Sequence, residues 1–120
     1  GSTRLLGFGV AGSPSGMVLV KQLADRYLKS INATLVTDDG TAADTAPLYN
    51  AGVPAMANEI YDTPDHAYYF RYHHSRGDSM SIMDPDDMDS NVLGIAAMFY
   101  MLADLQKQFQ DDNMRVWGTS

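Results

Sequence analysis

Two adjacent histidines and a nearby carboxylate form the densest group of side chains that could do chemistry. His73 and His74 follow an aromatic run, and Asp78 comes shortly after them. Neutral imidazole is the commonest metal ligand in proteins, and a carboxylate can hold its second ring nitrogen. Zinc sites need three or four protein ligands, so this group alone is too small. On spacing alone, a solvated turn with one packed histidine is the favoured interpretation.

Other kinds of site find less support. The pattern around Ser13 and Ser15 lacks the lysine and the glycine spacing of a phosphate-binding loop, and no Gly-x-Ser-x-Gly elbow marks a serine nucleophile. Cysteine is absent, which excludes disulfides, thiolate metal sites and cysteine nucleophiles within the chain. The formal net charge of −7 argues against a nucleic-acid or anionic-membrane partner. No apolar run is long enough to span a bilayer.

Two helix starts frame these residues. Ser13 and Pro14 predict the first start, because serine caps helices well and proline fits the first helical position. Its apolar stripe comprises Met17, Val20 or Lys21, Leu23 or Ala24, Tyr27 and Leu28. Asp84 and Pro85 predict the second start. Apolar residues then keep helical spacing at Met88, Val92, Ile95, Phe99, Leu102, Leu105 and Phe109.

Shorter elements are expected elsewhere in the chain. Residues up to 12 are glycine-rich and predict a loop or a broken edge strand. The aromatic run at residues 68–74 predicts an extended strand. Between the two helices we expect a strand at residues 34–37, a polar turn at 38–44, a short helix from Asp44 or Thr45 that Gly52 ends, and a strand at 53–57. This alternation predicts an α/β fold.

Three strings of residues together resemble the two-zinc exopeptidases of the aminopeptidase/glutamate carboxypeptidase family. Residues 51–55 read Ala-Gly-Val-Pro-Ala, residues 72–80 read Tyr-His-His-Ser-Arg-Gly-Asp-Ser-Met, and residues 83–85 read Met-Asp-Pro. The resemblance spans residues 12–105 and implies the C-terminal portion of a mostly parallel sheet flanked by helices. The expected organisation is a tag remnant and loop or edge strand at 1–12, the C-terminal segment of the peptidase catalytic domain at 13–110, and a tail at 111–120.

The resemblance also implies roles for individual residues. His74 matches the last zinc ligand, and Asp78 matches an acid that is structural or supports the ligands from just outside them. Asp44 matches an acid in the turn that lines the substrate cleft, to which Gly40 and Thr41 also belong. His73 matches a histidine found in only part of the family, and we place it at the cleft with an open role.

The same resemblance implies what this chain lacks. The general base and the other zinc ligands of the family lie upstream, so no catalytic residue is expected here. We therefore expect a segment cut from a longer exopeptidase, of carboxypeptidase or dipeptidase type, that carries two zinc ions. Its partners would be a peptide or dipeptide substrate and the remaining part of the catalytic domain, and the parent could be a homodimer. The isolated chain is expected to be inactive.

Two interpretations from other classes stay open. One is a non-catalytic receptor or scaffold with the same fold, which has lost the zinc ligands. The other is an acidic α/β interaction domain, in which the aromatic run at residues 68–72 would be a binding patch. Asn32 begins an Asn-Ala-Thr glycosylation sequon, and together with the family this predicts a secreted or lysosomal protein.

Overall fold

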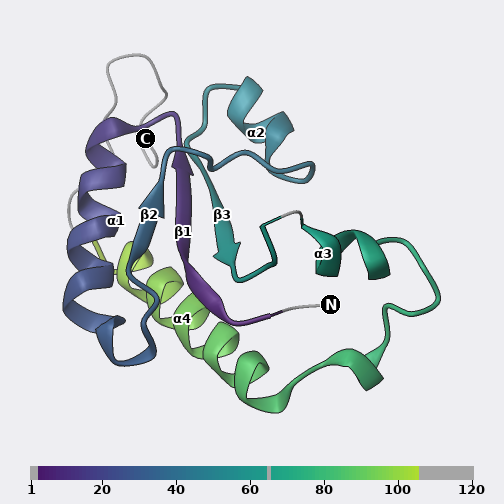
Figure 1. Ribbon diagram of the computed structural model, residues 1–120. Helices are drawn as coiled ribbons and strands as arrows, with labels where there is room; N and C mark the ends of the chain where they lie inside the picture. The colour runs from purple at the N-terminus through teal and green to yellow at the C-terminus, as the bar shows by residue number, and fades with distance from the viewer. Residues whose placement is uncertain (1–2, 65, 106–120) are drawn as a thin grey trace.

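The computed structural model of the protein describes residues 3–64 and 66–105. Its sheet contains β1 (Leu5–Ala11), β2 (Leu35–Thr37) and β3 (Ala55–Ile60), in the order β2-β1-β3. The α/β class is confirmed, but the expected mostly parallel arrangement is not. β1 runs parallel to β2 and antiparallel to β3. The chain stays at the carboxyl ends of β1 and β2 through helix α2 (Ala46–Asn50), so it enters β3 from that end and runs back (Figure 1).

The first strand lies at the centre of this sheet. The prediction of a loop or broken edge strand up to residue 12 is therefore wrong. Leu5, Phe8 and Val10 are buried and form part of the core. Pairing of this strand on both sides, together with burial of its side chains against the helices of the core, outweighs the low strand propensity of the glycines, because strand formation depends strongly on such context.

Helix α1 (Pro14–Tyr27) begins as its sequence predicts. The Ser13 side chain accepts a hydrogen bond from the Gly16 backbone N–H at 3.0 Å. Val20 and Ala24 on this helix pack against β1 in the core. Tyr27, which the predicted stripe includes, is exposed instead. The 3-10 turn η1 (Lys29–Ile31) then leads into β2.

Helix α4 (Pro85–Ala103) also begins at the predicted cap, where Asp84 accepts a hydrogen bond from the Asp87 backbone N–H at 3.0 Å. It packs on β1 through Gly94, since a Cβ there would lie 2.3 Å from a methyl carbon of Leu5. Buried Asn91 donates hydrogen bonds to the backbone oxygens of Thr3 and Asp87. Phe109, the last residue of the predicted stripe, lies outside the described residues.

The apolar stripe of α4 is not the face that meets the core. An apolar stripe on a helix normally faces the core. In this structure, the buried residues of α4 are Asn91, Gly94 and Met98, whereas Val92 and Phe99 are exposed. The helix is therefore rotated so that small and flexible residues contact β1.

The remaining elements connect these layers. Gly52 follows α2 with a φ of 85°, which confirms its predicted role as a left-handed helix stop. The strand expected at residues 53–57 begins two residues later and extends to Ile60. Residues 68–74 do not form the expected strand, because Ala67–Tyr72 is a helix, α3, which the 3-10 turn η2 (Met80–Ile82) follows. None of the described helices is long and apolar enough to cross a membrane.

Candidate metal centre

His74 lies in the turn that follows α3, and its side chain is exposed. The backbone at His74 has a φ of 54°, in the left-handed region. Ser75 closes the turn, since its hydroxyl donates to the Tyr72 carbonyl at 2.8 Å and accepts from the Gly77 N–H at 3.1 Å. The imidazole is therefore accessible to a metal and is carried on a hydrogen-bonded turn rather than on a strand.

The two histidines lie side by side. Their rings stack with centroids 3.8 Å apart and an interplanar angle of 20°, whereas adjacent strand residues would point to opposite faces. Tyr69 stacks in turn on His73, with centroids 4.6 Å apart. The stack holds the His74 ring against His73. It also places His73 directly beside any metal ion that His74 would bind.

Asp62 anchors the helix that carries this turn. Its carboxylate accepts hydrogen bonds from the backbone N–H groups of Thr63, Tyr68 and Tyr69, at 2.6, 3.3 and 3.1 Å. Burial alone would raise the pKa of Asp62, but these backbone bonds and the Thr63 hydroxyl lower it overall from 3.8. An ionised carboxylate at the start of α3 also suits the helix dipole.

Sequence reasoning did not find this role of Asp62. A capping side chain usually bonds an N–H two or three residues later, whereas Asp62 reaches residues six and seven positions on. It explains why an aromatic run with high strand propensity is helical here: the carboxylate satisfies two N–H groups of the first turn, which otherwise have no partner within a helix.

Asp78 belongs to the same turn as His74. Its backbone N–H donates to the Ser75 carbonyl at 3.2 Å, and its side chain is exposed. Burial raises the pKa of the neighbouring Tyr68, and the charges of Tyr72, Asp87, Asp78 and Asp62 raise it further. The charge of Asp78 is therefore one of several that contribute to the raised pKa of Tyr68.

The predicted cleft residues occupy the turn between β2 and α2. Gly40 is buried, and a Cβ there would lie 2.3 Å from the Ala11 backbone nitrogen and 2.7 Å from the Ala55 carbonyl oxygen. This places Gly40 against the ends of β1 and β3, where its first role is packing. Thr41 and Asp44 are exposed. The Thr45 hydroxyl accepts from the Ala42 N–H at 2.8 Å and holds this turn together.

The two candidate segments lie on the same side of the molecule. In Figure 1, α2 with its preceding turn and α3 with its following turn both lie beyond β3, away from α1. Within residues 3–64 and 66–105, no three His, Asp or Glu side chains gather closely enough to hold a metal ion. The described residues therefore offer single ligands and not a complete metal centre.

Asn32 lies on the surface. It ends η1 with a φ of 55°, a conformation that asparagine tolerates well, and its side chain is exposed. Within the sequon, Asn32 is therefore exposed, whereas Ala33 is buried and Thr34 is half-buried.

Comparison with curated proteins identifies one kind of relative. Carboxypeptidase Q from Mus musculus is 30% identical over 103 residues, and the proteins of that name from Bos taurus and Homo sapiens are 31% and 29% identical over 103 residues. Each match covers 84% of this chain and 20% of the relative, so the chain spans about one fifth of the length of these relatives. No family model and no solved structure matches. Over most of its length, the chain is thus similar to about one fifth of carboxypeptidase Q.

Proposed function

We propose that this chain is the C-terminal segment of a zinc-dependent exopeptidase of carboxypeptidase or dipeptidase type, and that it donates the His74 imidazole to a two-zinc site. The observation that carries the proposal is an exposed imidazole on a hydrogen-bonded turn, in a chain similar to carboxypeptidase Q. An accessible neutral imidazole is a good zinc ligand. The mixed three-stranded sheet would be one part of the larger sheet of such an enzyme.

The metal-binding side chains of the described residues are too few for a whole zinc site, which agrees with a chain that supplies only one of the ligands. A zinc ion needs three or four protein ligands, and no group of three is present among the described residues. The other ligands and the general base would therefore come from upstream polypeptide. Zinc bound there would supply an activated water and a polarised scissile carbonyl, and His74 would be the residue of this chain that holds it. Without the other ligands, the isolated chain should be inactive.

The chain's own residues position this ligand and shape the cleft. Asp62 holds the start of α3, and the ring of His73 packs on His74. We propose that Asp78 supports the metal-binding turn. Thr41 and Asp44 would line the substrate cleft, in the turn that buried Gly40 packs against the sheet. His73, next to the ligand, would border bound peptide.

The wider setting follows from the same proposal. The exposed Asn32 sequon suits a glycosylated protein that is secreted or lysosomal. Homodimerisation of the parent stays a prediction. The non-catalytic receptor or scaffold would lack the upstream ligands, and no comparison favours it. An interaction domain would use the rings of α3 as a patch, of which Tyr69 and Phe70 are exposed.

The test uses two histidines with nearly the same backbone conformation. His74 and His66 have φ values of 54° and 53°, and asparagine tolerates this region, so His→Asn at either position removes an imidazole with little backbone strain. In the longer polypeptide, His74→Asn should lower kcat/KM for a peptide by more than about 100-fold, because losses of that size follow even from changing groups around metal ligands. His66→Asn is the control. Equal, small losses in both variants would reject the ligand role of His74.

A further inference from the structure

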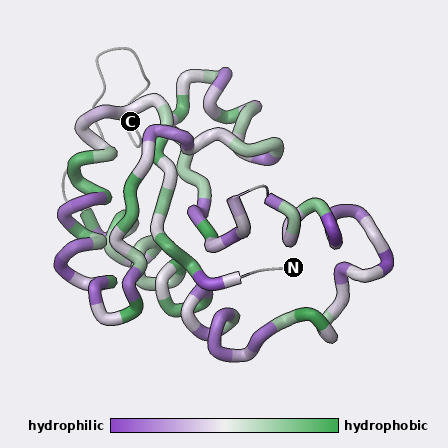
Figure 2. The backbone as a smooth tube through the Cα atoms, in the orientation of Figure 1, coloured by the Kyte–Doolittle hydropathy of each residue, from purple (hydrophilic) through white to green (hydrophobic). Residues whose placement is uncertain are grey.

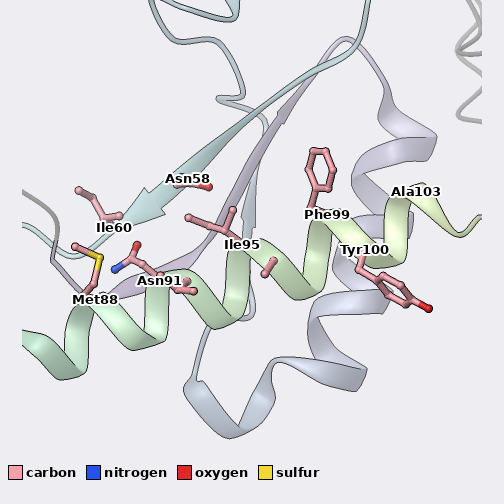
Figure 3. Close-up of a pocket in the computed structure, with 10 residues that line it drawn as sticks. Asn58, Ile60, Met88, Asn91, Ile95, Phe99, Tyr100 and Ala103 are labelled. Carbon is pink, nitrogen blue, oxygen red and sulfur yellow. The ribbon is translucent and has the colours of Figure 1, made fainter.

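Glu59 lies on the face of the sheet that points away from α4. Its neighbours on β3, Asn58 and Ile60, line a pocket against α4 (Figure 3). Successive side chains of a strand point to opposite faces, so the Glu59 side chain points to the other face of the sheet. It is half-buried there, although glutamate is depleted in strands. The partners of this carboxylate therefore lie on the face that α4 does not cover.

Glu59 reaches across the central strand to β2. Its Oε1 accepts a hydrogen bond from the Thr37 hydroxyl at 2.6 Å. On β1, which lies between the two strands, Gly7 is the residue paired with Glu59. Gly9 is the residue paired with Thr37. A Cβ at Gly9 would lie 3.0 Å from Glu59 Oε1 and would overlap the Asp39 carbonyl oxygen. The missing side chains of these glycines therefore leave the space through which the carboxylate reaches β2.

Thr37 connects this contact to the turn that follows β2. Its Oγ1 also accepts a hydrogen bond from the Asp39 backbone N–H at 3.4 Å. Because the hydroxyl hydrogen is donated to Glu59, the lone pairs of Oγ1 stay available to Asp39. Asp38 and Asp39 make the start of this turn hydrophilic (Figure 2), so hydrogen bonds rather than apolar side chains hold it. Glu59 therefore fixes the residues that lead into buried Gly40.

We propose that Glu59 is a positioning residue of the substrate cleft, which acts through Thr37 on the turn that follows β2. The inference rests on the proposed function, in which Thr41 and Asp44 of this turn line the cleft. The chain of hydrogen bonds ends in the turn and does not reach His74. Its loss should therefore weaken the binding of substrate without changing the metal site, which raises KM and leaves kcat unchanged.

Matched substitutions in the longer polypeptide test this role. Thr37→Val removes the hydroxyl and Thr37→Ser keeps it, while Glu59→Leu removes the acceptor oxygens and Glu59→Gln keeps one. At a temperature where all variants are folded, Thr37→Val and Glu59→Leu should each raise KM for a peptide about 10-fold, with kcat within about twofold. Thr37→Ser and Glu59→Gln should leave KM within about twofold of that of the unmodified protein.

The double variant that combines Glu59→Leu with Thr37→Val adds a sharper test. Both changes break the same hydrogen bond, so KM should again rise about 10-fold, as in either single variant. A KM raised about 100-fold in the double variant would mean that the two residues act independently, and would overturn the inference. A lowered Tm with an unchanged KM would make the contact merely structural, and would overturn it as well.

Amide exchange of the 120-residue chain separates this inference from the proposed function. The Asp39 amide donates to Thr37, whereas the Ala42 amide donates to the Thr45 hydroxyl within the turn. Glu59→Leu should therefore lower the protection factor of the Asp39 amide and leave that of Ala42 unchanged. An unchanged protection factor at Asp39 would overturn the inference, even if the longer polypeptide is a zinc peptidase. A lowered one, in a protein whose longer form has no peptidase activity, would reject the proposed function and keep Glu59 as the residue that positions this turn.

Discussion

Replacing Gly40 by alanine should destabilise the chain strongly, although the residue lies in a turn. A Cβ at Gly40 would lie 2.3 Å from the Ala11 backbone nitrogen, 2.6 Å from the Val10 carbonyl carbon and 2.7 Å from the Ala55 carbonyl oxygen. These atoms belong to β1 and β3, or lie at their paired ends. They cannot move aside as a side chain would, so the turn must lift or the strands must separate.

The expected loss follows from the cost of overpacking. Inserting a methyl group into a packed interior costs about 1–3 kcal/mol, and contact with backbone puts Gly40→Ala near the upper end. With a urea m-value of about 2 kcal/mol/M, a loss of about 3 kcal/mol lowers the unfolding midpoint by about 1.5 M. The assay is urea unfolding of the 120-residue chain followed by circular dichroism.

Thr41→Ala is the matched control for this prediction. Thr41 is the next residue in the same turn and is exposed, so its substitution should change stability by less than about 0.5 kcal/mol. A Gly40→Ala midpoint equal to that of Thr41→Ala would refute the close packing of this turn on the sheet. In that case, the only proposed role left for Gly40 would be its place in the turn that lines the substrate cleft.

Two further outcomes are expected. Burial opposes the lowered pKa of Asp62, but hydrogen bonds from Thr63, Tyr69 and Tyr68 prevail, so its folded pKa lies below 3.8. Its stabilisation of α3 is then complete above that value and is lost as the pH falls through the lowered pKa. The protection factor of the Tyr69 amide, which is the intrinsic exchange rate divided by the observed rate, should fall there, and a protection factor that does not change with pH would contradict this. Zinc titration of the 120-residue chain by calorimetry should reveal no tight binding, because three ligands do not meet; submicromolar affinity would disagree.

Local signals predicted the helix starts correctly because they act over a single turn. Ser13 and Asp84 each accept a backbone N–H three residues later, as the capping rule requires. Gly52 adopts the left-handed conformation that ends α2. Both partners of each such contact lie within a few residues of each other, so the local sequence is enough to predict it.

The sequence-based predictions were wrong where contacts that reach beyond a single helical turn decide the structure. The glycine-rich residues before 12 form the central strand because α1 and α4 bury Leu5 and Phe8. The aromatic run is helical because Asp62 binds its first N–H groups. For the candidate site, the structure places His74 and Asp78 in one exposed turn, and the metal-binding role of this turn stays a prediction. The stacking of His73 on His74 was not predictable, because it depends on the helix that replaces the expected strand.

Zinc content of the longer polypeptide tests the central claim most directly. Elemental analysis after dialysis against a fixed free zinc concentration would compare the unmodified protein with His74→Asn and His66→Asn. If the His74 imidazole is a ligand in a two-zinc site, His74→Asn should lose about one zinc ion per chain, while His66→Asn keeps both. Retention of two zinc ions by His74→Asn would contradict the assignment of this imidazole to the metal centre.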